Sequence, residues 1–193
     1  AYSQMDGKTP IYYSDSGFTT PIKDSRDGSY ANSANLEAGS YDNPYVNWSA
    51  TGYRLPTTGE WQYAASYRDG TSWTPYNYAS GATADYNDAT ATGLVAVCSS
   101  PEGSVTKNIG TKVANALGIY DMSGNAYEWC WDWHGTNFPA SAQTNYRGPA
   151  PALFRVFRGG SYFMGPNLQQ IGYHTGSKPF SKGIGGGFRV VCQ

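Results

Sequence analysis

The sequence predicts a single α+β domain in which a short helix and several short strands are joined by long irregular loops. Its 193 residues suit one domain, 1–193, better than two. Glycine (24 residues) and aromatic side chains (16%) are both abundant, as in proteins with many short strands and tight turns. One helix signal, near residue 57, and one strand signal, at 127–133, stand out from this background.

Residues 1–50 are predicted to be mostly loop with one or two short strands. Prolines and many Ser, Asn, Asp and Gly residues interrupt this segment. Its apolar residues fall in short groups such as 11–13 and 45–46, which are the candidate strands.

A helix is predicted from about Thr58 to Tyr67. Thr57 can cap its first turn, and Glu60 three residues later completes a capping box. An apolar face follows at helical spacing, formed by Trp61, Ala64 and Ala65.

The middle of the chain, 68–108, is predicted to be a long loop whose only strand-like apolar run is Leu94–Val97. A Ser-Gly-Asn turn at 123–125 then leads into an alternating strand at 127–133. Its two faces carry Tyr127, Trp129 and Trp131 on one side and Glu128, Cys130 and Asp132 on the other. The simplest interpretation is that the aromatic face is buried.

The last forty residues, 154–193, contain two strand-like ends around an irregular centre, 163–184, that fits neither the helical nor the strand period. Aromatic, glycine and small polar residues alternate there, a mixture typical of paratopes. The candidate ligand-binding residues are Tyr162, Phe163, Met164, Asn167, Tyr173, His174, Ser177, Lys178, Phe180 and Ser181. We expect 158–161 and 187–189 to be framework and the residues between them to tolerate change.

A competing interpretation makes the apolar residues of this centre part of the core. We favour it for Leu168 and Ile171. Exposure and burial both stay open for Tyr162, Phe163, Tyr173 and Phe180.

Charge and histidine content argue against several functions. The net charge is -1 and no run of Lys or Arg occurs, so neither nucleic acid nor an anionic membrane is an expected partner. His134 and His174 are the only histidines, too few for a zinc cluster. Ser161 lacks the nucleophile-elbow sequence of a serine hydrolase. Cys98, Cys130 and Cys192 allow at most one internal disulfide.

Four sequence words, in order along the chain, resemble the formylglycine-generating enzyme family, whose members have a C-type-lectin-like fold. They lie at 54–65, 118–129, 158–161 and 187–189. The resemblance implies about two helices around a small twisted antiparallel sheet, with long loops.

Catalytic members of that family place two copper-binding cysteines soon after the Gly-Gly-Ser word. Met164 and Gln169 occupy those places here. A thioether and an amide cannot supply two thiolates to copper, so we expect no oxidase activity. A copper oxidase of the formylglycine-generating type stays the alternative, and a structural surface domain without a ligand is a third.

The same words also resemble the variable proteins of diversity-generating retroelements, above all the treponemal type, in which a C-terminal segment is rewritten. That resemblance implies a non-enzymatic binding protein with 154–193 as its variable ligand-binding segment. It implies display on a bacterial cell surface, as a lipoprotein anchored through an N-terminal region not present here. We expect a monomer that binds a macromolecular ligand, a protein, and does not itself insert into the membrane.

No cofactor is required by this reading, but the family resemblance implies a structural Ca²⁺ on the Ser-Gly-Asn turn. Its ligands would be Asp121, the carbonyls of Gly124 and Ala126, and Glu128, all hard oxygen donors. The alternative is that Asp121 caps a turn and Glu128 pairs with Arg158 or Arg189. Both stay open.

Overall fold

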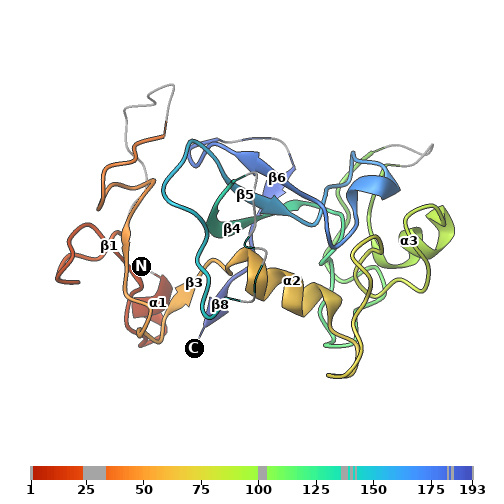
Figure 1. Cartoon of the computed structure of the whole chain (residues 1–193), viewed down its shortest axis with the longest axis horizontal. Coiled ribbons are helices and arrows are strands. Elements are labelled where there is room, and N and C mark those ends of the chain that lie inside the picture. The colour runs from red at the N-terminus through yellow and green to blue at the C-terminus, as the bar shows by residue number, and fades with distance from the viewer. Residues whose placement is uncertain are drawn as a thin grey trace.

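A four-stranded sheet and the helix packed on it form the centre of the molecule (Figure 1). The structure is a computed structural model that describes residues 2–23, 34–99, 104–135, 139, 141, 143–181, 183 and 185–192. Regular elements are short and loops are long, as predicted. In order along the chain the elements are α1 (Tyr2–Met5), β1 (Tyr12–Tyr13), β2 (Tyr45–Val46), β3 (Tyr53–Arg54), α2 (Thr58–Ser66), α3 (Ala89–Val95), β4 (Tyr127–Trp133), β5 (Arg155–Arg158), the 3-10 turn η1 (Pro166–Leu168), β6 (His174–Ser177), β7 (Gly186–Gly187) and β8 (Val191–Cys192).

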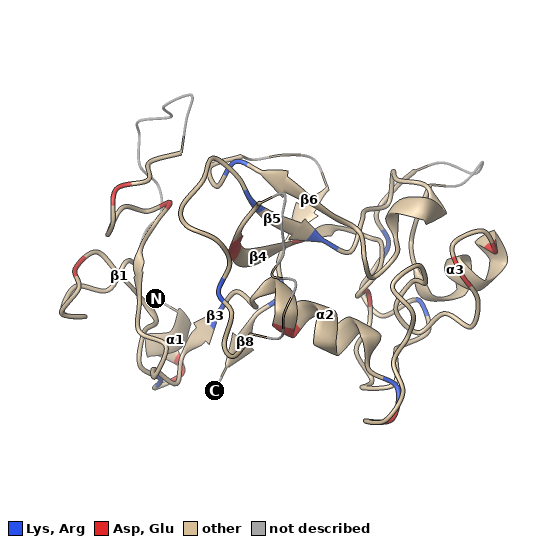
Figure 2. Cartoon of the chain, viewed as in Figure 1, with Lys and Arg blue, Asp and Glu red and all other residues tan. Residues whose placement is uncertain are grey.

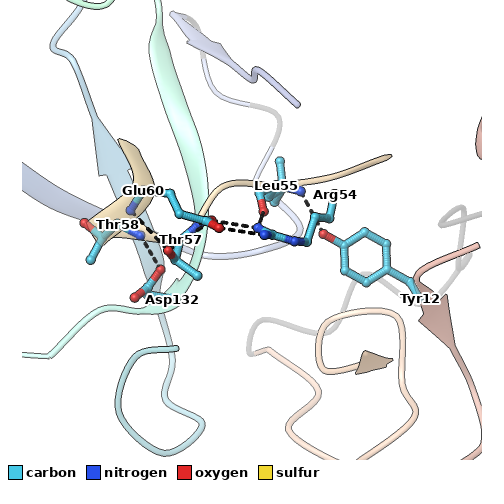
Figure 3. Close-up of polar contacts among 7 residues, drawn as sticks. All are labelled: Tyr12, Arg54, Leu55, Thr57, Thr58, Glu60 and Asp132. Carbon is cyan, nitrogen blue, oxygen red and sulfur yellow. Dashed lines mark hydrogen bonds and ion pairs between the residues drawn. The ribbon is translucent and has the colours of Figure 1, made fainter. Parts of the chain in front are cut away.

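Helix α2 begins with the predicted capping box (Figure 3). The Thr57 hydroxyl accepts from the Glu60 N–H at 3.2 Å, and a Glu60 carboxylate oxygen accepts from the Thr57 N–H at 2.8 Å. Arg54 adds a two-point ion pair to the same carboxylate, at 2.7 and 2.6 Å. The predicted helix is therefore confirmed, and its last residue is Ser66, with Tyr67 as the C-cap.

The central sheet has the strand order β6-β5-β4-β7. Strand β5 pairs antiparallel with both β4 and β6, whereas β7 pairs parallel with β4. The sheet was expected to be antiparallel, and it is instead mixed, with one parallel pair of strands. The parallel pair arises because the chain crosses back after β6 and returns beside β4 in the same direction. The candidate binding centre, 163–184, contains β6 and ends next to β7.

Strand β4 buries the face of Glu128, Cys130 and Asp132, whereas the aromatic face that was predicted to be buried is buried only at Tyr127. Cys130 and Asp132 are 0% and 1% exposed, and Cys130 joins Trp61, Met122, Val156 and Ile171 in the core. Trp129 and Trp131 on the opposite face are only half-buried. The acidic face can be internal because its carboxylates are bonded: Asp132 accepts from the Thr58 N–H at 2.5 Å, at the start of α2.

The segment Leu94–Val97, expected to be strand-like, includes the last turn of α3 instead. Asp88 caps this helix by accepting from the Ala91 N–H at 2.9 Å. Its buried residues, Ala91, Thr92 and Val95, lie on one helical face. The expectation was wrong because a short apolar run has no clear period, and the preceding cap decides the conformation.

The two small sheets match the loop-rich N-terminal region. Strands β1 and β2 lie at the two candidate strand positions and pair with each other, and β3 pairs with β8, so Cys192 lies opposite Tyr53. None of the three cysteines forms a disulfide in the described residues. Within the same residues, no helix has the length and apolar character needed to cross a bilayer.

The Arg-Gly-Gly-Ser word turns sharply at its glycines. Gly159 has φ +86°, and a Cβ there would lie 3.0 Å from the Met122 carbonyl and 3.4 Å from the Trp61 ring. Gly160 has φ +70°, whereas Gly187, in the second framework word, has no positive φ. Gly159 and Gly160 therefore need the left-handed backbone that glycine favours, and Gly187 does not.

We predict that Gly159→Ala lowers the free energy of unfolding by roughly 1–3 kcal/mol, because the new side chain would strain a left-handed backbone against the core. Gly187→Ala is the matched control and should cost less. Chemical denaturation of both variants measures the difference, and equal losses would contradict the prediction.

The pH dependence of stability should report on Asp132. Burial raises the pKa of this carboxyl to about 6, and one of its oxygens has no hydrogen-bond partner among the described residues. The folded protein therefore holds a proton that the unfolded chain releases at lower pH. The stability from this group is complete below about pH 4 and is lost as pH rises through about 6.

Asp132→Asn removes that titration. We predict that the free energy of unfolding of the wild type, minus that of the variant, falls by about 3 kcal/mol between pH 4 and pH 7. Urea unfolding at several pH values tests this, and a difference that does not change with pH would contradict it.

Candidate functional site

The candidate binding segment is held by its main chain. Seven hydrogen bonds join framework groups to main-chain atoms of 162–173: Tyr162 N to Asn125 O (3.1 Å), Ser99 N to Met164 O (2.9 Å), Ser123 Oγ to Gln169 O (2.8 Å), Ile171 N to Tyr78 O (2.8 Å), Gly172 N to Tyr76 O (2.7 Å), and Arg158 Nη1 to Ile171 O (3.2 Å) and Tyr173 O (3.3 Å). None of these bonds uses a side chain of the segment. Its backbone path therefore does not depend on which residues it carries at exposed positions.

Arg158 makes two of these seven hydrogen bonds, more than any other side chain. It is 2% exposed, and it also donates to Thr58 Oγ1 at 2.7 Å and to Gln62 Oε1 at 3.2 Å. Burial lowers the pKa of Arg158, and Asp132 is one of the charges that oppose the shift. One buried guanidinium thus ties α2 to both sides of Gly172.

Gln169, at one of the two positions that hold copper-binding cysteines in the resembling enzymes, is fully buried. Its Nε2 donates to the Ser161 carbonyl at 2.9 Å and to the Met164 carbonyl at 3.1 Å. The side chain therefore closes the turn after the Gly-Gly-Ser word. Met164 itself is half-buried.

Strand β6 divides the predicted site residues between two sides of the sheet. Thr175 pairs with Phe157 and Gly176 with Val156, a core residue. Because side chains alternate along a strand, Tyr173, Thr175 and Ser177 lie on the Phe157 side. We call this side the outer sheet face.

His174 lies on the inner side, where α2 packs. Its ring centroid is 5.3 Å from that of His134, and a Cβ on Gly176 would touch His134. Burial, helped by Arg158 and His134, lowers the pKa of His174 to about 4. His174 is therefore a neutral side chain near pH 7 and does not share a face with Tyr173 and Ser177.

Framework aromatic rings form the floor of the outer sheet face. Phe157 stacks on Tyr127, with ring centroids 5.3 Å apart, and tilts against Trp129 at 4.0 Å. Burial, and then the Tyr173 hydroxyl, raises the pKa of Tyr127. The sequence prediction did not include these three rings in the site because they lie outside the irregular centre. Their alternation in β4 and β5 is the signal that could have found them.

The rest of the segment lies against this floor or beside it. Phe163 is 39% exposed and meets Tyr162 edge to face at 5.0 Å. A Cβ on Gly185 would be 2.5 Å from the Phe163 ring, and one on Gly186 3.3 Å from Phe157. The backbone of Gly185 and Gly186, which carry no side chains, therefore passes close to both rings.

Other predicted residues vary in exposure. Asn167 is exposed, whereas Lys178, Phe180 and Ser181 are half-buried, and the Lys178 amino group lies 5.7 Å from the Phe180 ring centroid. Ile171 is 1% exposed, as favoured, while Leu168 is only half-buried.

Next to the Ser-Gly-Asn turn, Glu128 forms an ion pair with Arg189, which was one of the alternatives to a calcium site. Both Glu128 oxygens accept from Arg189, at 2.6 and 2.5 Å, and one also accepts from the Trp61 indole at 2.7 Å. Asp121 accepts from the Gly110 N–H at 2.8 Å. A guanidinium thus neutralises the Glu128 carboxylate, whereas Oδ1 of Asp121 is buried and has no hydrogen-bond partner among the described residues. The structural Ca²⁺ on this turn stays a prediction.

Comparisons with known proteins give the family of the chain and its fold. Residues 23–193 match the family described as the sulfatase-modifying factor enzyme 1-like domain. The chaperone protein LppX of Paenibacillus barcinonensis is 34% identical over 76% of this chain and 51% of its own length. The formylglycine-generating enzyme of Thermomonospora curvata is 31% identical over 77% of this chain and 52% of its own length. The chain thus spans about half the length of these two relatives.

A solved structure covers nearly all of the chain. Treponema denticola variable protein 1 superposes with a TM-score of 0.77 and 29% identity, over 99% of this chain and 65% of that one. A structure named CarF superposes with a TM-score of 0.68 and 25% identity, over 99% of this chain and 61% of that one. The α+β fold of the enzyme-like variable proteins is confirmed.

Proposed function

The chain belongs to the sulfatase-modifying factor enzyme 1-like domain family, and we propose that within it this chain is a non-enzymatic ligand-binding protein of a diversity-generating retroelement. Its C-type-lectin-like scaffold would display a variable surface built from 154–193. The likeness to a treponemal variable protein over 99% of the chain supports this choice. Ligand binding and diversification are the proposed part.

The observation that carries the proposal is the set of seven hydrogen bonds between framework groups and main-chain atoms of 162–173. A surface whose side chains change from copy to copy needs a backbone position that those side chains do not determine. Arg158, Ser123 and the loop carbonyls at 76 and 78 supply that position. Exposed side chains can then change the ligand without changing the fold.

The residues at the expected copper positions favour a binding protein over an oxidase. Met164 has no thiolate, and Gln169 is a buried structural side chain. The partner we propose is a protein, because half-exposed aromatic rings beside small polar groups are typical of protein-binding surfaces. We propose a monomer on a bacterial cell surface, attached through a region outside this sequence, with no cofactor.

We predict that the loss of stability caused by a substitution in the segment depends on how buried the replaced side chain is, and not on its position along the segment. Phe163→Ser, Asn167→Ala and Thr175→Ala should each change the free energy of unfolding by less than about 1 kcal/mol. Gln169→Ala should lower it by about 2 kcal/mol or more, because two buried carbonyls lose their donor.

Thermal and urea unfolding of the four variants measure this separation. The proposal of a tolerant surface would fail if the changes at Phe163, Asn167 and the half-buried Thr175 destabilised the protein as much as Gln169→Ala.

The enzyme alternative has its own test. We predict that the copper-supplied protein neither consumes oxygen nor oxidises a cysteine in a substrate peptide. An authentic formylglycine-generating enzyme, run in parallel, is the positive control. Turnover above the rate with copper alone would overturn the non-enzymatic assignment.

A further inference from the structure

We propose that four aromatic rings on and beside the outer sheet face bind an uncharged protein segment, which places one large apolar side chain among them. The rings are those of Trp129, Phe157, Phe163 and Phe188, and we call them the aromatic patch. This inference rests on the proposed function and names the chemistry of the ligand. It follows from the exposure of the rings and from the placement of the charged residues around them.

Phe188 extends the outer sheet face past its last strand. Strand β7 pairs in parallel with β4, and a Cβ on Gly186 would lie 3.3 Å from the Phe157 ring, on the outer side. Three positions further on, Arg189 bonds to Glu128 on the inner side. Because side chains alternate along an extended chain, Phe188 lies on the outer side. It is 70% exposed.

Two glycines keep the other rings of the patch accessible. The backbone of Gly185 runs beside the Phe163 ring, and the backbone of Gly186 follows it with no side chain of its own. Phe163 is 39% exposed, whereas Trp129 and Phe157 are half-buried. Neighbouring apolar rings that are open to water are typical of a surface that another protein covers.

Most of the patch lies outside the irregular centre, 163–184. Trp129 and Phe157 come from β4 and β5, and Phe188 is the middle residue of the Gly-Phe-Arg word. Only Phe163 belongs to the centre. The chemistry of the patch would therefore stay largely the same when the centre changes.

The basic residues of the last forty positions do not serve the patch. These positions contain five Lys or Arg and no Asp or Glu. Arg158 and Arg189 bond to partners on the inner side, and Arg155 is 5% exposed and donates to two backbone carbonyls. Lys178, directly after β6, lies on the inner side by strand alternation. Lys182 lies outside the described residues.

The acidic residues of the sheet also point away from the patch. Figure 2 shows the charged residues of β4 and β5. The two carboxylates of β4, Glu128 and Asp132, both accept from groups of α2 on the inner side. Strands β6 and β7 have no Asp, Glu, Lys or Arg. Among the described residues of these four strands, none thus offers a charge to a ligand on the patch.

This arrangement selects an uncharged occupant. A carboxylate placed on the patch would lose its water and gain no cation, and an ammonium group would gain no carboxylate. A cation could bind to an open ring face, but Phe157 already contacts Tyr127 and Trp129. An apolar side chain has no such cost, and its burial among the rings is favourable.

Hydroxyl groups supply the polar contacts beside the patch. Tyr173, Thr175 and Ser177 line β6 on the outer side, and each carries a hydroxyl that can donate or accept. They can bond to the N–H and C=O groups of a peptide backbone without an ion pair. The structure therefore favours an uncharged peptide stretch with one aromatic or large aliphatic side chain.

Selection from a displayed library of random peptides on the wild-type chain tests the inference. We expect the enriched peptides to share an aromatic or large aliphatic residue within an uncharged stretch. Their affinity should change less than about twofold between low and high salt, because no ion pair forms. A charged consensus whose binding weakens with salt would overturn the uncharged occupant.

Two variants at one position give the matched charge test. Thr175→Glu and Thr175→Lys each place a charge beside the patch, and each should weaken binding of the selected peptides about tenfold, because the ligand would desolvate either charge. Tighter binding to one of the two would identify a charged ligand and overturn the inference.

Phe188→Ser locates the site. It should weaken binding about tenfold or more without lowering the melting temperature, because the ring is largely exposed. Tyr63→Ser is the matched control, since Tyr63 is an exposed aromatic residue on α2, on the other side of the sheet. Binding should be unchanged in this control.

The outcomes separate the two proposals. Peptides that lose binding with Tyr173→Ala but not with Phe188→Ser would overturn the aromatic patch and leave the variable segment standing as the binding surface. Peptides that bind both variants as well as wild type would overturn both proposals.

Two other occupants of the patch are tested in parallel. A neutral oligosaccharide that binds on a glycan array and is lost with Phe188→Ser, with no peptide selected, would overturn the protein ligand. Sedimentation of the wild-type chain should show a monomer. A dimer that Phe188→Ser dissociates would place a second copy on the patch and overturn the inference.

Discussion

The ion pair between the buried Glu128 and the half-buried Arg189 is the interaction on which the rest of the structure depends. Glu128 is 7% exposed and sits on the central strand β4, and burial raises its pKa although Arg189 opposes the shift. Arg189 lies 61 residues further on, and Trp61 of α2 donates to the same carboxylate. One carboxylate therefore joins the helix, the sheet and the end of the chain. Removing Arg189 would leave a buried carboxylate without its guanidinium partner, which is far more costly than losing an exposed pair.

A second arginine, Arg158, which is buried, extends this framework to the candidate binding segment. Arg158 connects Thr58 and Gln62 of α2 to carbonyls on both sides of Gly172. Buried polar side chains thus hold the backbone of the segment in a way that apolar packing cannot. Their hydrogen bonds go to backbone carbonyls, which are present whatever side chains the segment carries. This division explains how a loop-rich segment can be well positioned and still tolerant of change.

The same division is familiar from other binding surfaces. Aromatic rings with few rotors supply contact area, and small polar residues adapt to the ligand. In this protein the rings come from two sources: Phe157 and Trp129 belong to the framework, whereas Tyr162, Phe163 and Tyr173 belong to the segment. Under the proposed function, the framework rings would be common to all variants of the surface, and the segment would determine the specificity of each.

The sequence by itself determined the features that depend on near neighbours or on residue identity. These are the capping box at Thr57 and Glu60, the framework words, the missing cysteines at 164 and 169 and the basic character of the last forty residues. Tertiary structure decided which face of β4 is internal, on which side His174 lies, and that 89–95 is helical. The physical reason is distance along the chain. A cap is closed by a residue three positions away, whereas the buried face of β4 depends on partners such as Thr58, 74 residues from Asp132, that no local pattern reveals.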